Sequence, residues 1–394
     1  MSHNKLNFDN NVVKESLIKS ANYLHKSLDL SYNQIHDLPL DFVNAFTRNN
    51  FDNLNLKSNQ IQSIEWMNAN CAAIFGGNNG LPIPKWIETI DTIQNITINN
   101  CNLKTFDPSQ FGYGMKSLIH LDLSSNNIDS IGSFLNNGST EGLISLIVSR
   151  NSIVDLSESN LHYLKLLEVL MVDRNQINSV KFLDGINMPY LKVMDFSYNN
   201  INEIPITISF MPSIIDINLS HNEIQLIGGQ FLKSFKHLEI FKCSYNKLGS
   251  HPIFSDGIAS NIFKNNDKLK LIQLSNNELS TSISNEMFTN LENLQEIDFS
   301  FNKITIIESQ SFNMNTNIEI INLENNAINV LPSLLFSNNK KLRILKLNNN
   351  NIESIPMVPY GTFRNNVVLE IITLSNNLIN EIPNNVSRIL YMNR

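Results

Sequence analysis

The stretch LQEIDFSFNKI, residues 294–304, decides the fold of this 394-residue chain, because close copies of it recur along nearly the whole length. Other copies read LRILKLNNNNI at 342–352, LKVMDFSYNNI at 191–201 and LIHLDLSSNNI at 118–128. Each fits the template LxxLxLxxNxL, in which L is any aliphatic residue or Phe; its positions are numbered 1 to 11 below. Such self-similarity at a fixed period is the sequence signature of a repeat architecture.

The template occurs fourteen times, and most ninth positions follow one another at spacings of 23 to 27 residues. The ninth positions are Asn33, Asn59, Cys101, Asn126, Asn151, Asn175, Asn199, Asn222, Asn246, Asn277, Asn302, Asn326, Asn350 and Asn377. Positions 4 and 6 alternate with polar neighbours, which predicts short half-buried strands that stacked turns join into one parallel sheet. An amide at position 9 can both donate to and accept from buried backbone groups, so we interpret these Asn residues as structural.

Many copies continue as xxI/LP, and several then place a Phe ten to thirteen residues beyond the Asn. We expect Phe210, Phe288, Phe312, Phe336 and Phe363 to stack as a spine inside the convex side. The 24-residue form LxxLxLxxNxLxxLPxxxFxxLxx resembles the typical class of leucine-rich repeats found in Toll-like receptor ectodomains and small leucine-rich proteoglycans. The resemblance implies an α/β solenoid, a right-handed horseshoe of about 14 repeats with a parallel β-sheet on the concave face, which binds partners, usually proteins.

The resemblance covers residues 25–390, which we interpret as the solenoid, followed by a short tail at 391–394. The cysteine-rich terminal caps of the extracellular family members are absent from the sequence. In their place, residues 1–24 are predicted to form a helical cap, because Val13, Leu17, Ala21 and Leu24 fall on one stripe of a short amphipathic helix.

Two intervals are longer than the period, and we expect irregular turns at 60–92 and 249–268. The first contains both tryptophans of the chain, Trp66 and Trp86. One interpretation is a degenerate repeat whose Trp side chains fill the core. The other is a protruding loop through which Trp66 and Trp86 contact a partner, since insertions in solenoids map to loops that are often functional.

The solvent-facing positions 2, 3, 5, 7 and 8 of each strand define the predicted binding surface. In repeats five to nine, roughly residues 143–248, position 8 reads Arg, Arg, Tyr, His, Tyr, whereas Ser and Asn fill much of the rest of the column. Arg and Tyr are enriched in interface hot spots. The predicted contact residues are Ile144, Ile147, Arg150, Val169, Met171, Arg174, Asp195, Tyr198, His221, Lys242 and Tyr245. The alternative is that these side chains only fill ordinary solvated strand positions.

Other function classes are disfavoured by composition and motifs. Lys and Arg number 29 against 36 Asp and Glu, giving a net charge of −7 without any basic run, so we expect no nucleic-acid partner. No metal-ligand spacing occurs among the eight histidines, and no catalytic motif is present, so we expect no metal, no cofactor and no enzyme activity. Cys71 has no candidate base near it in the sequence.

The leading hypothesis is therefore a non-catalytic scaffold that holds a protein or peptide partner, with its oligomeric state left open. Three cysteines, an N-terminus without an apolar segment and no run of 18 apolar residues predict a cytoplasmic protein that does not insert into membranes. One alternative is a secreted or surface recognition module for a microbial or host ligand, and another is the recognition domain of a larger signalling enzyme. Four glycosylation sequons, at Asn95, Asn137, Asn218 and Asn385, are too few to decide in so Asn-rich a chain.

Overall fold

The computed structural model divides the chain into two compact units, residues 1–177 with 186–191 and residues 178–185 with 192–394. The residues whose placement the structure describes are Glu15, Lys104, Phe106, the strands between 27 and 99 as backbone, 118–131, 140–156, 161–205 (162 as backbone), 208, 210–251, 257–356, 362–363 and 365–381. Of the predicted N-terminal cap, only Glu15 is described, and it is helical. The tail at 391–394 lies outside the described residues.

The described residues of the first unit form seven parallel strands in the order β1-β3-β5-β6-β7-β8-β9. Their bounds are β1 Ser27–Asp29, β3 Asn53–Lys57, β5 Ala72–Gly76, β6 Asn95–Asn99, β7 His120–Asp122, β8 Ser145–Ile147 and β9 Val169–Met171. A second ladder pairs β2 (Asp37–Leu38) with β4 (Ser63–Ile64), also in parallel. The 3-10 helix η3, Leu161–Tyr163, lies between β8 and β9 in the sequence.

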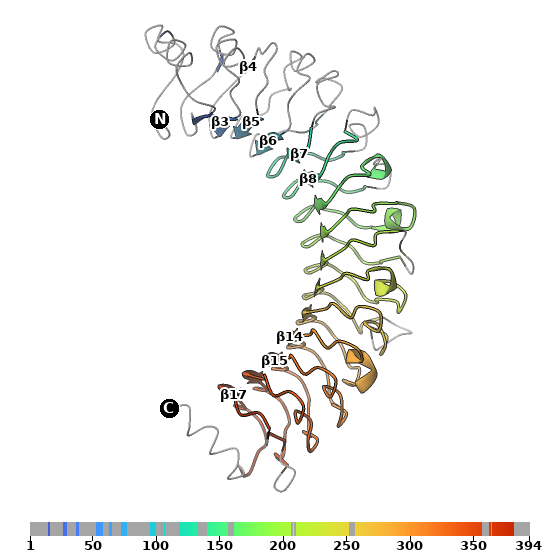
Figure 1. Ribbon diagram of the computed structural model, residues 1–394, viewed down its shortest axis with the longest axis vertical. Coiled ribbons are helices and arrows are strands. Elements are labelled where there is room, and N and C mark those ends of the chain that lie inside the picture. Colours follow the sequence, from blue (N-terminus) through green and yellow to red (C-terminus); the bar gives the residue numbers. More distant parts are fainter. Residues whose placement is uncertain are drawn as a thin grey trace. The chain divides into compact units, whose positions relative to one another are not determined.

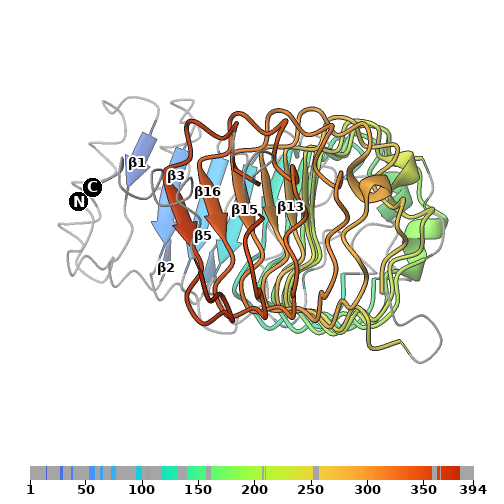
Figure 2. The ribbon, with the colours of Figure 1, turned by 90° about the horizontal axis from the view of Figure 1, so that it is seen from below.

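The second unit contains eight parallel strands that follow one another in chain order. Their bounds are β10 Val193–Asp195, β11 Asp216–Asn218, β12 Ile240–Lys242, β13 Leu271–Gln273, β14 Glu296–Asp298, β15 Ile320–Asn322, β16 Ile344–Lys346 and β17 Ile371–Thr373. Figure 2 labels β13, β15 and β16 among the arrows of this sheet, in which β14 lies between β13 and β15. The 3-10 helices of this unit are η4 Lys181–Asp184, η5 Leu232–Ser234 and η6 Asn285–Phe288.

Each unit is a solenoid in which one turn of the chain supplies one strand and one returning segment, as Figure 1 shows for the turns around β14 and β15. Most strands of the second unit have a buried central residue, at position 4, between two half-buried residues. Position 6 is buried as well, for example at Phe299 and Leu323. The period-2 alternation therefore puts one face of each strand into the core and leaves the other exposed, which confirms the predicted solenoid with a parallel sheet.

The interval between Asn59 and Cys101 contains one more repeat than the sequence pattern predicts. β5 pairs in parallel with β3 on one side and β6 on the other. Because Ala73 aligns with Ile96 and Phe75 with Ile98, the register puts Ala73 at position 4 and Asn78 at position 9. Among the described residues the two units thus hold fifteen such strands, one more than the fourteen copies of the template, and β5 agrees with the interpretation of 60–92 as a degenerate repeat.

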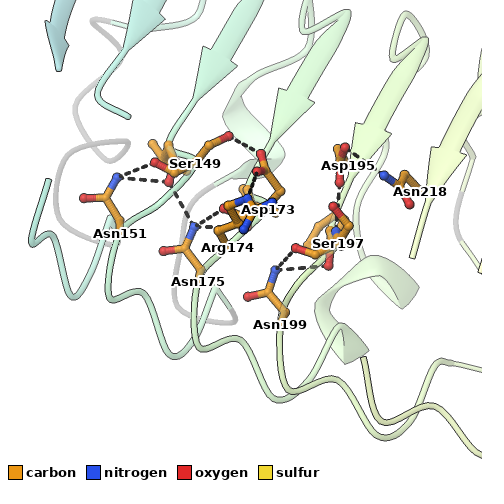
Figure 3. Close-up of polar contacts among 12 residues, drawn as sticks. Ser149, Asn151, Asp173, Arg174, Asn175, Asp195, Ser197, Asn199 and Asn218 are labelled. Atoms are coloured by element: carbon orange, nitrogen blue, oxygen red, sulfur yellow. Dashed lines mark hydrogen bonds and ion pairs between the residues drawn. The ribbon is translucent and has the colours of Figure 1, made fainter. Parts of the chain in front are cut away.

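The ninth-position Asn residues tie each turn to the one before it. The Asn302 amide donates to the carbonyl oxygens of Leu274 in the preceding repeat (2.9 Å) and Phe299 in its own turn (3.0 Å). Its Oδ1 accepts a hydrogen bond from the backbone N–H of Leu279 at 3.1 Å. In Figure 3, Asn151 and Asn175 of the first unit show the same inward-turned amide. The predicted structural role is confirmed for the described ninth-position Asn residues, because buried backbone groups are satisfied by them, whereas Asn33, Asn59 and Cys101 lie outside the described residues.

Four of the five predicted spine residues form the spine. Phe288, Phe312, Phe336 and Phe363 are buried, and their rings stack in sequence with centroids 5.5 to 5.8 Å apart. The prediction for Phe210 is wrong, since this residue is 63% exposed. Each true spine residue lies six positions before position 1 of the next strand, and this register places Ile208, which is buried, in the slot.

A second set of Asn residues lies three positions after buried Phe residues of the returning segments. Asn266, Asn315, Asn339 and Asn366 are almost fully buried. The Asn339 amide donates to the carbonyls of Phe312 and Asn315, both at 2.9 Å. These side chains therefore fasten the returning segments to one another as the ninth-position Asn residues fasten the strand ends, and they explain part of the chain's Asn richness.

Within the predicted irregular turn at 249–268, residues 257–268 have the burial of an ordinary returning segment, and residues 252–256 lie outside the described residues. Ile258, Ile262 and Phe263 are buried, as core residues of the returning segment should be. The backbones of Gly249 and Gly257 touch, since a Cβ built on Gly257 would lie 2.9 Å from the Gly249 Cα. Seven residues, 250–256, separate the two glycines, which equals the excess of this 31-residue interval over the 24-residue period. The chain thus leaves the regular solenoid path at Gly249 and rejoins it at Gly257.

Candidate functional site

The candidate site is the exposed face of the sheet, and its most distinctive feature is the backbone at position 8. Every described residue at this position has a positive φ, between 53° and 58°. The set is Ser125, Arg150, Arg174, Tyr198, His221, Tyr245, Asn276, Phe301, Asn325, Asn349 and Asn376. A non-glycine residue adopts this left-handed conformation at a cost, and Asn and Asp tolerate it best. Asn is therefore frequent in this column because it adopts the left-handed conformation at a lower cost than most other residues.

Three aromatic side chains at position 8 of the second unit form a continuous stack, called the aromatic ladder below. The rings of Tyr198 and His221 have centroids 3.9 Å apart at an interplanar angle of 9°, and those of His221 and Tyr245 are 4.2 Å apart at 10°. Tyr198 and Tyr245 nevertheless remain 41% and 50% exposed. The ladder thus presents ring edges and hydroxyl groups to solvent while its facing ring surfaces cover each other.

The first unit brings together the predicted apolar spot and two arginines. Ile147 of β8 and Met171 of β9 are directly paired, and both are half-buried. Ile144 and Val169 are half-buried as well. At position 8 of the same two repeats, Arg150 and Arg174 are exposed. Arg174 Nε lies 3.9 Å from the Asp173 carboxylate, which also accepts a hydrogen bond from the Ser149 hydroxyl (Figure 3).

The side chain at position 5 also has a structural role, which was not predicted from the sequence. Asp195 Oδ1 accepts a hydrogen bond from the Ser197 N–H at 2.8 Å, and its Oδ2 accepts one from the Asn218 amide at 3.0 Å (Figure 3). The same side-chain turn recurs at Asp122, Asn218 and Asp298. Asp and Asn commonly bond to a backbone N–H two residues on. Asp195 therefore shapes the strand end as well as lying on the predicted contact surface.

Two carboxyl groups on the sheet face of the second unit, those of Asp216 and Glu296, have raised pKa values. Burial raises the pKa of Asp216, and the nearby Asp195 raises it further, although the Lys242 ammonium at 3.7 Å lowers it. Burial and Asp298 likewise raise the pKa of Glu296, while Lys346 lowers it. Desolvation and like charges both disfavour an ionised carboxylate. This face therefore has negative charge that its own lysines neutralise only in part.

The remaining candidate residues add no second site. Trp66, Trp86 and Cys71 lie outside the described residues. Burial raises the pKa of the Cys243 thiol, which makes it an inert core side chain. Within the described part of the chain, no group of His, Cys, Asp and Glu could hold a metal ion. The helices in that part are too short and too polar to cross a membrane.

Another exposed aromatic residue lies in the position-8 column. Phe301 occupies position 8 of a later repeat and is 50% exposed. It lies outside repeats five to nine, where the contact surface was predicted. The signal that could have identified it is the same column of position-8 residues, in which it is the one Phe.

Sequence comparisons find leucine-rich repeats. Residues 267–328 match the family described as leucine rich repeat. Toll-like receptor 3 of Homo sapiens is 24% identical over 300 residues, covering 68% of this chain and 32% of the receptor. Lumican of Gallus gallus is 27% identical over 202 residues, covering 50% of this chain and 53% of lumican. The chain thus spans about a third of the receptor's length and about half of lumican's.

Solved structures show the same fold. A leucine-rich-repeat protein of Leptospira interrogans superimposes with a TM-score of 0.68 at 20% identity, and the alignment covers 99% of both chains. A chain of the Drosophila Toll–Spatzle complex superimposes with a TM-score of 0.67 at 19% identity, covering 88% of this chain and 46% of the other. Similarity at this level of identity establishes the architecture, whereas function depends on the site.

Proposed function

We propose that this chain, whose residues 267–328 match the leucine-rich-repeat family, is a non-catalytic scaffold that holds a protein or peptide partner on the exposed face of its sheet. The observation that carries the proposal is the aromatic ladder. Tyr198, His221 and Tyr245 adopt a backbone conformation in which Asn is the less strained residue, as at Asn276 and Asn349.

The first unit supports the same proposal with different chemistry. Exposed Arg150 and Arg174 flank the ends of the strands that carry Ile147 and Met171. An apolar patch rimmed by arginines is the composition of an interface centre, because these side chains bury area and still make hydrogen bonds. We therefore retain the predicted contact residues of both units, and each unit is tested separately.

Replacing both tyrosines of the ladder, Tyr198→Asn with Tyr245→Asn, is expected to weaken binding of the native partner by about tenfold or more. The free energy of unfolding should change by less than about 2 kcal/mol, since the easier left-handed conformation of Asn offsets lost ring stacking. The partner, recovered from native cells by affinity capture and then purified, is titrated by calorimetry against the wild type and the variant. Arg174→Asn tests the first unit in the same assay.

Phe301→Asn is the matched control, because it removes an equally exposed aromatic ring from the same backbone conformation outside the predicted surface. Its affinity for the partner should stay within about twofold of the wild type. If the double tyrosine variant binds with unchanged affinity, the partner does not use the aromatic ladder. If the Phe301 variant loses as much affinity as the double tyrosine variant, the ladder is no more important for binding than other exposed aromatic residues of position 8.

A second candidate function is a secreted or cell-surface recognition module. The sequence relatives favour it, because Toll-like receptor 3 and lumican belong to the secreted and surface class rather than to the predicted cytoplasmic one. The sequon at Asn218 provides a test, since this residue lies on β11 and its amide donates to Asp195. A glycan there would cover the proposed surface of the second unit.

We expect the protein from native cells to carry no glycan at Asn218, whichever compartment it occupies. Peptide mapping by mass spectrometry gives the occupancy at Asn218 and at the other three sequons. Occupied sequons elsewhere would establish export and favour the second candidate. An occupied Asn218 would contradict a partner site at the aromatic ladder.

A further inference from the structure

The aromatic ladder excludes some ligands by its geometry. Sugars and unpaired nucleobases bind aromatic side chains through the flat faces of the rings. In the ladder both faces of His221 are covered, by Tyr198 on one side and Tyr245 on the other. A base or sugar therefore cannot stack on His221. The outer faces, edges and hydroxyl groups of the two tyrosines remain, and these suit the long aliphatic stems and polar heads of polypeptide side chains.

The charges around the ladder favour a basic partner. At positions 3, 5, 7 and 8 of the second unit there are five carboxylates and two lysines, namely Asp195, Asp216, Glu296, Asp298 and Glu324 against Lys242 and Lys346. Position 2 adds three acidic and three basic residues, which leaves the excess of three negative charges unchanged. On the strands beneath the ladder, Lys242 Nζ is 3.7 Å from Asp216, whereas Asp195 accepts hydrogen bonds from the Ser197 N–H and the Asn218 amide.

The ladder and these carboxylates lie within reach of one short segment. Asp216 is at position 3 and His221 at position 8 of the same repeat, so they are five residues apart. Five extended residues span at most about 16 Å. A partner segment of similar length can therefore cover both features at once.

Building on the proposed function, we propose that the aromatic ladder and the Asp195–Asp216 pair form a docking site for a basic polypeptide segment. The aliphatic stems of its Arg or Lys residues lie on the exposed edges of Tyr198 and Tyr245, and their cationic heads reach the two carboxylates. Electrostatic complementarity of this kind sets partner choice and association rate. A cation at this place also relieves the repulsion that Asp195 exerts on Asp216.

The test uses the full chain and a fluorescein-labelled peptide of alternating Arg and Ser, with a Glu-Ser peptide as the opposite probe. Fluorescence anisotropy should show that the Arg peptide binds and the Glu peptide does not. The affinity for the Arg peptide should be about tenfold lower in Asp195→Asn/Asp216→Asn and in Tyr198→Asn/Tyr245→Asn. Asn at position 195 keeps the side-chain turn, as Asn218 shows. The Asp216 carboxyl, followed by NMR, should titrate at lower pH when the peptide is bound.

Glu292→Gln/Glu353→Gln is the charge-matched control, because it removes two exposed carboxylates that lie off the sheet face of the same unit. If this control weakens binding of the Arg peptide as much as Asp195→Asn/Asp216→Asn does, the effect depends only on net charge and the proposal is wrong. The proposal is also wrong if the Glu peptide binds as tightly as the Arg peptide. If the ladder variant no longer binds the native partner but the wild type does not bind the Arg peptide, the scaffold function is supported and the basic-partner inference is wrong. If the Arg peptide binds as expected but the native partner is unaffected by the ladder variant, the proposed function of the ladder fails instead.

Discussion

Replacing Asn222 with alanine is expected to lower the free energy of unfolding by about 3–5 kcal/mol, because it orphans buried backbone groups in two repeats. The Asn222 amide donates to the carbonyls of Phe196 and Leu219, both at 3.0 Å. Its Oδ1 accepts the N–H of Ile201 at 3.0 Å. Alanine offers neither donor nor acceptor, and water has little access to a residue that is 8% exposed.

The measurement is urea denaturation of the full chain followed by far-ultraviolet circular dichroism. Asn200→Ala is the control, because Asn200 is an exposed residue at position 10 of the preceding repeat. This substitution removes a side chain of the same size without orphaning a buried backbone group, so it should change stability by less than about 0.5 kcal/mol.

Asn222→Asp should destabilise at least as much as Asn222→Ala at neutral pH. The carboxylate keeps the acceptor for the Ile201 N–H, but it places a buried negative charge against the carbonyl oxygens of Phe196 and Leu219. A loss of stability in Asn222→Ala no larger than that in Asn200→Ala would refute the structural role of the ninth position.

The strand positions and the ninth-position Asn residues could be predicted because the same physical demand recurs in every turn. Positions 4 and 6 must be apolar to fill the core, and position 9 must satisfy backbone groups where the chain leaves the strand. β5 escaped because Asn70 and Gly80 stand at positions 1 and 11 of its repeat, where the template requires apolar residues. The pairing of β5 with β3 and β6 supplies the register that its side chains do not reveal.

The spine prediction fails at Phe210 because it counts residues forward from the Asn. The returning segment varies in length, so its register is set by the next strand, and Ile208 rather than Phe210 fills the slot. The left-handed backbone at position 8 escaped for another reason. Asn276, Asn325 and Asn376 carry the signal, but their amides look like ordinary polar surface in a chain so rich in Asn.

The predicted contact surface rests on strand positions, and the structure adds what position alone cannot express. The stacking of Tyr198, His221 and Tyr245 depends on three repeats having the same backbone conformation at one place. The structural role of Asp195 depends on a hydrogen bond from the Ser197 N–H, which the assignment of position 5 to the solvent-facing side does not express. Sequence periodicity assigns residues to faces, whereas contacts between neighbouring turns decide what each face offers a partner.

Gly257→Ala is expected to lower the free energy of unfolding by more than about 2 kcal/mol, because the new methyl group meets backbone that cannot move aside. Gly257 has a φ of +70°, and its Cβ would lie 2.7 Å from the carbonyl carbon of Leu248 and 2.9 Å from the Cα of Gly249. The Gly257 carbonyl also accepts the N–H of Ile227 at 2.9 Å, so a shift of this backbone breaks a bond between repeats. The point where the chain leaves and rejoins the regular solenoid path therefore requires two glycines in contact.

Gly228→Ala in the same unit is the matched substitution, since no atom lies within 4 Å of the Cβ it would add. It should leave stability unchanged or raise it by about 0.4–1 kcal/mol, because alanine restricts the unfolded chain. Urea denaturation of both variants gives the difference directly. If Gly257→Ala proves as stable as Gly228→Ala, the two glycines do not touch, and the seven residues between them must join the solenoid in some other way.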